Sequence, residues 1–487
     1  MVNSHCAFAL ALLLQVFYWS CSSVEVVQTA KGTSDRLTPK TGFQFQKNFE
    51  SSISIQVNRS FRFQEMLGFG GAFTESSSFV WSGLNSESRQ QILDLFFSKD
   101  GLQYSLARVP IGSCDFSLSF YSYDDVEGDT DLEHFSIEHD QKWRIPFMKA
   151  AIATRAKWSN TSIKFLGSPW SAPGWMKSDG LMSCPVSCLL CTLKAKYQDT
   201  YSKYISLFVS KFTEIGIPIW GVTVQNEPGA CSPLYEGMHF TPETERDFVK
   251  NHLGPVLSSD HPHLALLVYD HNKDHVAKWA ETIYSDKNAS QYVWGMAVHW
   301  YSGDQFSNLN TTHYIDVSKP ILATEATVKR EKDPTDPLWS HGEHYAHDMI
   351  GDFNNWVVGF IDWNLLLDMY GGPDHAGPHE CEGLIKCGSD AMILADNTTG
   401  KIYLQTFYYY MGHFSKFVPP GSIRIGVVSS NEDLEATGFV TPDNTTAVVV
   451  MNSHDDPITY KLLDEISTLA VNVTIPAHAI QTVLYSV

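Results

Sequence analysis

Eight short apolar runs, each ending in polar or aromatic residues, dominate the sequence from about residue 65 onward. They begin at Met66, Tyr104, Ile163, Ile217, Leu264, Val293, Lys319 and Val357. Longer amphipathic stretches separate the runs, and this alternation of strand-like and helix-like segments is typical of parallel α/β folds. Eight such units predict an α/β fold in which a (β/α)8 TIM barrel carries insertions.

Several of the intervening stretches carry helix signals. Asn85 is placed to cap a helix that runs to Phe97, and Thr241 to cap one that has Pro242 at its first position. Another stretch ends at Gly216, and its aromatic residues share one helical face: Tyr197, Tyr201, Tyr204, Phe208 and Phe212.

A doubly wound sheet is the structural alternative to the barrel. Such sheets usually have fewer strands and a glycine-rich phosphate-binding turn. The segment 68–71, Gly-Phe-Gly-Gly, resembles this turn weakly but lacks the G-x-G-x-x-G spacing. The count of runs therefore favours the barrel.

Short strand-like segments replace the alternating pattern after about residue 415. They read IRIGVVSS, ATGFVTP, TTAVVVMNS, TYKLLD, VNVTIP and QTVLYSV, and they predict an additional antiparallel β-sandwich domain. Residues 40–63 contain FQFQ and SISIQV and are expected to join that sandwich. We predict four regions: a signal peptide over 1–23, N-terminal sandwich strands over 24–64, a catalytic barrel over 65–414 and the C-terminal sandwich over 415–487.

Composition excludes some classes of function. The net charge of −20 argues against nucleic-acid binding, which needs basic patches, and against unaided docking on an anionic membrane. Hydrophobic residues make up 43% and charged residues 18% of the chain, so a large core is expected and disorder is not.

The N-terminus and the sequons indicate the secretory route. Residues 6–19 form an apolar run that is too short to span a membrane, and the small residues at 20–23 suit signal cleavage. No later segment is long and apolar enough to span a membrane, so we expect a soluble mature protein. Seven Asn-X-Ser/Thr sequons predict N-glycosylation at Asn58, Asn160, Asn288, Asn310, Asn397, Asn444 and Asn472.

The sequence has nine cysteines, of which Cys6 and Cys21 lie in the expected signal peptide. Seven remain, so at least one is unpaired, and Cys114 in an apolar strand is the expected free thiol. Cys381 and Cys387 are a natural local disulfide. Two further disulfides, in an order that the sequence leaves open, are expected among Cys184, Cys188, Cys191 and Cys231; a zinc site there is the alternative.

Two carboxylates occupy the strand ends where barrel active sites lie. Asn226 and Glu227 end the fourth run, and Glu325 ends the seventh. Hydrolysis of a glycoside needs one carboxylic acid that protonates the leaving oxygen and one carboxylate that attacks or activates water. We therefore predict Glu227 and Glu325 as the catalytic pair.

Other strand ends supply groups that suit sugar binding. Asp115, Trp170, Trp363, His299 and Tyr301 end four further runs, and Asp115 is expected to accept hydrogen bonds from sugar hydroxyls. A single aromatic residue is more often part of the core, but here several strand ends agree. Arg108 lies inside a strand, where an unpaired charge is costly, and we predict that it supports the nucleophile by keeping that carboxylate ionised.

No metal or other cofactor is predicted. The segment 341–347 contains three histidines and a glutamate, but an exposed helix face explains it better than a metal site. The sequence has neither the H-E-x-x-H motif of zinc proteases nor the G-x-S-x-G motif of α/β-hydrolases.

The chain resembles the acid β-glucosidases, the lysosomal glucosylceramidases of glycoside hydrolase family 30, from about residue 40 to the C-terminus. The motifs that carry the resemblance are GFGGA, RVP with SCDFS, SPW with P-x-W, NEP, AVHWY, TEA, DWN with GGP, and GHFSKF. The resemblance implies a (β/α)8 barrel with a β-sandwich built from both ends of the chain. It also implies that Glu227 is the acid/base and Glu325 the nucleophile, with a glucose-binding shell of Asp115, Trp170, Asn226, His299, Tyr301 and Trp363.

The same resemblance implies retaining hydrolysis of glucosylceramide to glucose and ceramide. The expected substrate is a glycosphingolipid at a membrane surface, with a saposin-type activator and anionic lipid as partners, in the lysosomal lumen or after secretion. The mechanism requires a raised pKa at Glu227, which we expect the neighbouring charge of Glu325 to supply.

Several positions depart from the family pattern. Thr327 stands where the family often has cysteine, and Asp374 stands where it has asparagine. The loop after NEP is short, residues 178–192 carry a cysteine cluster, and the family's N-terminal cysteine-paired segment is missing. These changes leave open a related glycosidase acting on a steryl glucoside, a xyloside or a galactoside, and a catalytically silent glycan- or lipid-binding protein.

Overall fold

Eight parallel strands close into a barrel in the computed structural model, which describes residues 24–46, 52–184, 187–329, 335–376, 379–380 and 386–486. Each strand falls within one of the eight apolar runs. They are β4 (Gly68–Ala72), β5 (Leu106–Ile111), β6 (Lys164–Pro169), β7 (Ile219–Thr223), β8 (Ala265–Asn272), β9 (Gly295–His299), β10 (Ile321–Glu325) and β11 (Val357–Asn364). Strand β11 pairs with β4 and closes the ring, so the predicted TIM barrel is confirmed and the doubly wound alternative is wrong.

The glycine-rich segment that resembles a phosphate-binding turn is the barrel strand β4. A Cβ atom on Gly70 would lie 2.0 Å from the carbonyl oxygen of Leu106 on β5. Glycine is therefore required by the close approach of two strand backbones.

Helices cover the outside of the barrel. They are α1 (Glu75–Gly83), α2 (Ser86–Phe97), α3 (Glu138–Gln141), α4 (Arg144–Ala156), α5 (Gln198–Glu214), α6 (Pro242–Phe248), α7 (Gly254–Asp260), α8 (Val276–Tyr284), α9 (Lys287–Ser290), α10 (Phe306–Ile315), α11 (Trp339–Asn354) and α12 (Thr406–Ser415). Asn85 caps α2 and Thr241 caps α6, each by accepting a hydrogen bond from a backbone N–H three residues on. The expected aromatic face of α5 is buried.

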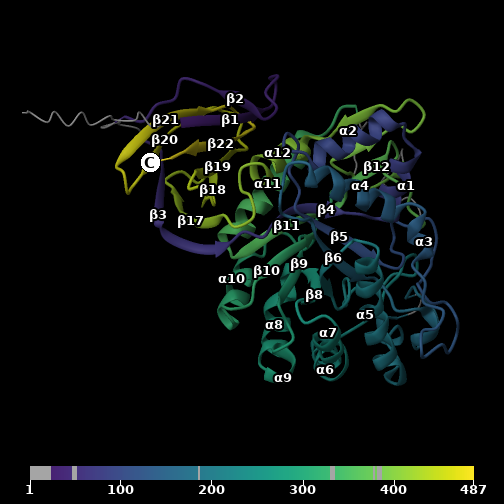
Figure 1. The fold of residues 1–487 in the computed structure, drawn as a ribbon. Helices are drawn as coiled ribbons and strands as arrows, with labels where there is room; N and C mark the ends of the chain where they lie inside the picture. Colours follow the sequence, from purple (N-terminus) through teal and green to yellow (C-terminus); the bar gives the residue numbers. More distant parts are fainter. Residues whose placement is uncertain are drawn as a thin grey trace, which may run out of the picture.

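Both ends of the chain contribute to one nine-stranded sheet. Its order is β2 (Thr38–Lys40), β1 (Val24–Ala30), β22 (Ala479–Tyr485), β19 (Thr446–Asn452), β18 (Leu434–Val440), β17 (Ile423–Ser429), β3 (Ser54–Glu65), β20 (Ile458–Asp464) and β21 (Leu469–Ile475). Figure 1 shows the purple N-terminal strands beside the yellow C-terminal strands. The sheet curls so that β21 contacts β22, which encloses the apolar core of a sandwich.

The sheet packs against the barrel through α11 and α12. His413 of α12 lies 2.9 Å from the hydroxyl groups of both Thr29 and Thr482, which belong to the two ends of the chain. A small sheet of β12 (Leu366–Asp368), β15 (Ile393–Ala395) and β16 (Ile402–Leu404), and a hairpin of β13 (His379–Glu380) and β14 (Lys386–Cys387), follow the last barrel strand.

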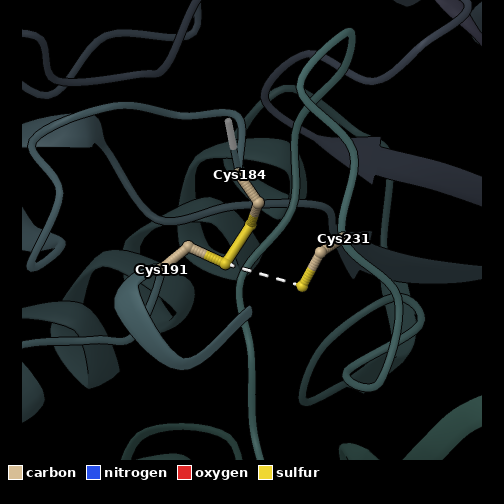
Figure 2. Close-up of side chains that lie close together, drawn as sticks. All are labelled: Cys184, Cys191 and Cys231. Carbon is tan, nitrogen blue, oxygen red and sulfur yellow. Dashed lines mark hydrogen bonds between the residues drawn. A yellow bond between two sulfur atoms is a disulfide. The ribbon is translucent and has the colours of Figure 1, made fainter. Parts of the chain in front are cut away.

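The disulfide predictions are confirmed in part. Cys184 and Cys191 form a disulfide, and the sulfur of Cys231 lies 3.8 Å from that of Cys191 (Figure 2). Cys114 is a buried free thiol, as predicted. Because two of the proposed zinc ligands are joined as a disulfide, the zinc alternative does not fit this arrangement. The expected Cys381–Cys387 pair and the side chain of Cys188 lie outside the described residues.

The predicted signal peptide also lies outside the described residues. Of the seven sequon asparagines, Asn160, Asn288, Asn397 and Asn444 are exposed, whereas Asn58, Asn310 and Asn472 are partly buried. Glycosylation stays a prediction. Within the part of the chain that the structure describes, no helix has the length and apolar character that a membrane span needs.

Candidate active site

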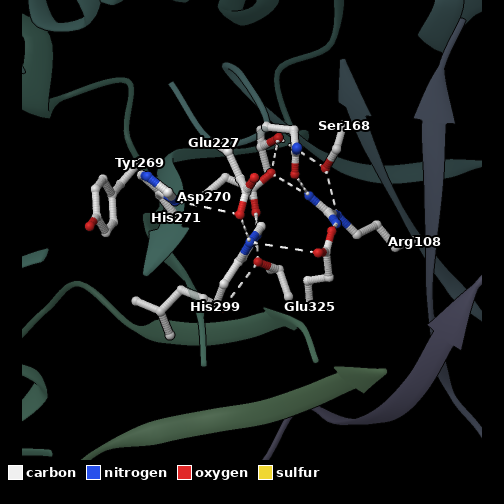
Figure 3. A network of polar contacts seen from close by, with 12 residues as sticks. Arg108, Ser168, Glu227, Tyr269, Asp270, His271, His299 and Glu325 are labelled. Carbon is white, nitrogen blue, oxygen red and sulfur yellow. Dashed lines mark hydrogen bonds and ion pairs between the residues drawn. The ribbon is translucent and has the colours of Figure 1, made fainter. Parts of the chain in front are cut away.

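Arg108, on strand β5, lies at the centre of a polar network at the C-terminal ends of the barrel strands. Its guanidinium group is fully buried and forms ion pairs with Glu325 and with Asp270, the latter at 2.8 Å (Figure 3). It also donates hydrogen bonds to Asn226 at 2.7 Å and to Ser168 at 3.1 Å. A planar cation with this many donors fixes the carboxylates and the amide in one arrangement.

Asp270, at the end of β8, is the central carboxylate of the network, and the sequence analysis missed it. Besides Arg108 it accepts hydrogen bonds from the hydroxyl groups of Thr223 at 2.7 Å and Thr324 at 2.6 Å. Burial alone would raise the pKa of Asp270, but the charges of Arg108 and His299 hold it well below its usual value. The available signal was the polar ending Asp-His-Asn of the fifth apolar run.

The backbone around Asp270 is bent so that consecutive side chains reach the site. Tyr269, Asp270 and Glu227 have positive φ values of 77°, 51° and 45°, and the β8–β9 register shifts between Tyr269 and His271. A buried carboxylate oxygen of Glu245 accepts the N–H of Tyr269 at 2.9 Å, and Glu227 N–H donates to the Asp270 carbonyl at 2.9 Å. Strained residues of this kind concentrate at functional sites.

His299, the last residue of β9, connects Asp270 with both predicted catalytic glutamates. Its Nε2 lies 2.9 Å from Asp270, and its Nδ1 lies 3.4 Å from Glu227 and 3.9 Å from Glu325. Burial lowers the pKa of His299, but the charge of Glu325 and the contacts with Asp270 and Glu227 raise it to about 9. The imidazole is therefore protonated at neutral and acidic pH.

The protonation of Glu227 corrects one sequence-based expectation. Burial alone would raise its pKa, but His271, at 3.6 Å, and His299 hold the pKa below its usual value. The contacts with the two histidine rings therefore outweigh the effect of burial. In this arrangement the proton that an acid catalyst needs lies on the adjacent histidine, and Glu227 is a carboxylate.

Glu325, the last residue of β10, is held at both of its oxygens. Oε2 contacts Arg108, and Oε1 accepts a hydrogen bond from the Tyr301 hydroxyl at 2.8 Å. One oxygen of Glu325 and one oxygen of Glu227 lie within 4.8 Å of each other. Both glutamates therefore face the same small space.

The two predicted sugar-stacking tryptophans lie against Arg108. The rings of Trp170 and Trp363 stack on each other at 5.1 Å, and their centroids lie 4.7 and 5.5 Å from the guanidinium carbon. Only 3% of Trp170 and 2% of Trp363 is exposed, so most of each ring is part of the core around Arg108. The expected open stacking faces are largely covered.

Asp115 lies in the loop after β5, outside the hydrogen-bond network of Arg108. Its Oδ1 is buried without a hydrogen-bond partner among the described residues. Burial, followed by the charges of Asp374, Glu325 and Glu236, raises the pKa of Asp115 well above its usual value. Asp115 therefore has carboxylates as its charged neighbours, Glu325 included, whereas Glu227 and Glu325 contact His299 and Arg108.

The histidine-rich segment forms part of α11, as predicted, but its face is not wholly exposed. His341 lies 3.2 Å from Asp390, and His347 lies 2.7 Å from Glu435 on β18, because α11 packs between the barrel and the sheet. Among the described residues, one group with metal-ligand spacing lies at the site, namely Glu227, His299 and Glu325. Arg108 and protonated His299 already supply positive charge there, which disfavours an added cation.

A TIM barrel that brings two carboxylates together at its C-terminal face has the architecture of many glycoside hydrolases. Residues 66–418 match the glycosyl hydrolase family 30 TIM-barrel domain, and residues 421–483 match the β-sandwich domain of that family. The chain belongs to glycosyl hydrolase family 30.

Relatives in this family carry glucosylceramidase names. Putative glucosylceramidase 3 of Caenorhabditis elegans is 36% identical over 92% of this chain and 85% of its own length. Lysosomal acid glucosylceramidase of Mus musculus is 34% identical over 82% of this chain and 77% of its own length. These identities support a glycoside hydrolase and confirm the family resemblance.

Solved structures extend the range of relatives. SrfJ from Salmonella typhimurium superposes with a TM-score of 0.87 at 30% identity, covering 95% of this chain and 99% of its own. The endo-β1,6-glucanase BT3312 superposes with a TM-score of 0.81 at 27% identity and the same coverage. Relatives with this fold therefore include one named for a different glycan.

Proposed function

We propose that the chain is a retaining β-glucosidase that hydrolyses glucosylceramide to glucose and ceramide. The retaining mechanism rests on one observation: one carboxylate oxygen of Glu227 lies within 4.8 Å of one carboxylate oxygen of Glu325. Retaining glycosidases hold their carboxyl groups about 5–5.5 Å apart, whereas inverting enzymes leave room for a water molecule. The glucosylceramidase names of the relatives support glucose and ceramide as the products.

In the first step, a Glu325 oxygen bonds to the anomeric carbon while the glycosidic C–O bond breaks and the leaving oxygen takes a proton from Glu227. Arg108 and Tyr301 each hold one oxygen of Glu325 and so orient the carboxylate. In the second step, water bonds to the anomeric carbon, its proton passes to Glu227, and the ester bond to Glu325 breaks.

The proton for the first step is supplied across the His299–Glu227 contact. His299 Nδ1 lies 3.4 Å from Glu227, and Asp270 holds the opposite nitrogen. Transfer of this proton to Glu227 leaves a neutral imidazole bonded to Asp270. The raised pKa of about 9 at His299 therefore stores the proton over the whole acidic range.

Exposed apolar side chains around the barrel mouth support a lipid-bearing substrate. The segments after β5, β6, β7 and β12 expose Leu118, Phe120, Leu181, Leu189, Leu190, Leu234 and Tyr370. Large apolar residues on the loops around an active site suit a lipid tail or a membrane surface. The name of the lysosomal relative supports a lysosomal or secreted location. A saposin-type activator and anionic lipid are the partners that we propose.

A β-glucose-configured epoxide, followed by intact mass and peptide mapping, tests the proposal. A single adduct on Glu325, and release of glucose and ceramide from glucosylceramide micelles, are the expected results. Glu325→Gln is expected to lose the adduct and essentially all turnover; substantial remaining activity would contradict the assignment.

A related glycosidase is the second candidate, because a relative in the family is named an endo-β1,6-glucanase. Rates on aryl β-glucoside, β-xyloside and β-galactoside, on a steryl glucoside and on β1,6-linked glucan separate it from the first. A folded protein that hydrolyses none of these and forms no adduct would instead be a silent binding protein.

A further inference from the structure

A second group of acids, of which one is buried and two are half-buried, lies in the loops after β5, β7 and β12, and the reaction derived above does not use it. We call Asp115, Glu236 and Asp374 the distal acidic cluster. Glu236 is only 1% exposed and lies in the loop between β7 and α6, whereas Asp374 lies between β12 and β13. The inference below rests on the proposed glycosidase function.

The contacts of Glu236 with His375 require a proton between them. His375 Nδ1 lies 3.2 Å from the carbonyl oxygen of Ser117, which can only accept, so Nδ1 carries the ring hydrogen and Nε2 of the neutral ring is an acceptor. Nε2 lies 3.5 Å from Oε2 of Glu236, and both atoms are buried without a hydrogen-bond partner among the described residues. Burial lowers the pKa of His375, which favours the neutral ring, and two facing acceptors then repel unless Glu236 is protonated.

Ser113 holds the other oxygen of Glu236. Its hydroxyl group contacts Oε1 of the carboxyl group and accepts the N–H of Tyr121 at 2.9 Å, so the acid proton is left for Oε2, which faces His375. The cation that faces this region, Lys177, donates instead to the carbonyl oxygens of Met182, Ser183 and Gly237. Burial raises the pKa of Glu236 to about 7, and the charge of Asp374 adds to this effect.

The backbone around Glu236 places the preceding residue near the catalytic pair. The backbones of Glu236 and Ser183 form an isolated antiparallel β-bridge, and Gly237 N–H donates to the carbonyl oxygen of Met182 at 2.9 Å. Tyr235 packs against the apolar cluster that contains Trp170 and Trp363, and burial followed by the charges of nearby carboxylates raises its pKa. His375 N–H donates to the carbonyl oxygen of Asp115 at 3.3 Å. A contact that joins Glu236 to His375 therefore fixes both Tyr235 and Asp115.

We infer that Glu236 is a positioning residue: as a protonated acid it joins the β7–α6 loop to His375 and so holds Tyr235 and Asp115 in place for the glycoside. As Glu236 ionises, its hydrogen bond to Nε2 is lost and a further negative charge faces Asp115 and Asp374. The loop is then held less firmly. Substrate binding is expected to weaken, whereas Glu227 and Glu325 keep their own partners.

The test compares KM and kcat on a soluble aryl β-glucoside between pH 4.5 and 8. In the wild type, KM is expected to rise several-fold as pH passes through about 7, with a smaller change in kcat. Glu236→Gln keeps a donor for His375 and an acceptor for Ser113 but cannot ionise, so its KM is expected to stay nearly constant. Glu236→Ala is expected to raise KM by about tenfold at every pH, because a buried hydrogen bond is lost.

The exposed Glu87, on α2, offers a matched control, and Glu87→Gln is expected to behave as the wild type. A rise in KM that is identical in the wild type and Glu236→Gln would overturn the inference, as would a KM that is flat in the wild type.

Infrared spectroscopy gives a readout that does not need turnover. The difference between wild type and Glu236→Gln at pH 5.5 is expected to show the carbonyl band of one protonated carboxyl group. The band without any glycoside hydrolysis would contradict the proposed function alone. Hydrolysis without the band would contradict the role of Glu236 alone.

Discussion

The barrel mouth holds two groups of buried and half-buried carboxylates, and their pKa values shift in opposite directions. The arginine centre comprises Arg108, Glu227, Asp270, His299 and Glu325; the distal acidic cluster comprises Asp115, Glu236 and Asp374. In the first group, Asp270 and Glu227 have lowered pKa values. In the second, Asp115 and Glu236 have raised pKa values.

The difference comes from the partners of the carboxylates. Arg108 and protonated His299 lie within the arginine centre, and their charge outweighs the cost of burying its carboxylates. The cation near the distal acidic cluster, Lys177, donates to backbone carbonyls. One group thus supplies ionised side chains for chemistry, whereas in the other Glu236 is a protonated acid that faces His375.

Arg108→Met should break the comparison most severely. It leaves Asp270 and Glu325 buried without their cation, and removing one partner of a buried pair costs about 3–5 kcal/mol. We expect a loss of unfolding free energy in this range, measured by urea denaturation, and loss of detectable hydrolysis. Arg108→Lys keeps the charge but loses the planar guanidinium group that contacts both carboxylates. We expect its unfolding free energy and activity to lie between those of the wild type and Arg108→Met. Wild-type stability in Arg108→Met would refute the central role of this cation.

Asp270→Asn should have the next largest effect. The amide keeps the size of the side chain but removes the charge that raises the pKa of His299. The stored proton is then lost at lower pH, so the alkaline limb of the kcat/KM profile is expected to move downward. We expect a loss of about 10²-fold in kcat/KM at pH 6. An unchanged alkaline limb would show that His299 does not store the proton.

Asp374→Asn should shift the distal acidic cluster toward the behaviour of the arginine centre. Its charge raises the pKa of Asp115 and Glu236, so the substitution is expected to lower both. The rise of KM with pH then begins at a lower pH, by a few tenths of a unit to about one unit. Glu281→Gln, on the exposed surface of α8, is the control that removes one carboxylate elsewhere. A midpoint that moves upward would contradict the electrostatic explanation.

The sequence predicts much of this fold because periodicity reports burial directly. The alternation of apolar runs and amphipathic stretches predicts all eight barrel strands, and the polar residues at the run ends include Glu227 and Glu325. Asp270 could not be predicted because an irregularity in the β8–β9 register and a positive φ turn its side chain toward Arg108. The spacing of apolar residues in the sequence does not reveal either feature. The ionisation of Glu227 was expected wrongly because it depends on His271, whose approach the irregularity also creates.

His347, on α11, tests whether an ion pair must be buried to contribute substantially to the free energy of unfolding. Its ring lies 2.7 Å from Glu435 on β18, and 39% of the side chain is exposed. The hydrogen bond with Glu435 raises the pKa of His347 to about 9, although burial acts against it. A raised pKa stabilises the fold fully below the ordinary value of about 6.5, and this contribution is lost as pH rises through about 9.

His347→Gln is therefore expected to lower stability by less than about 1 kcal/mol at pH 5, since exposed pairs are screened by solvent. The difference from the wild type should vanish above about pH 9. Thermal unfolding at the two pH values measures it. His454→Gln is the control, because the pair of His454 with Asp433 joins two loops at the edge of the sheet and is more exposed. A loss as large as that of Arg108→Met would mean that pairing, without burial, decides what a charge contributes in this protein.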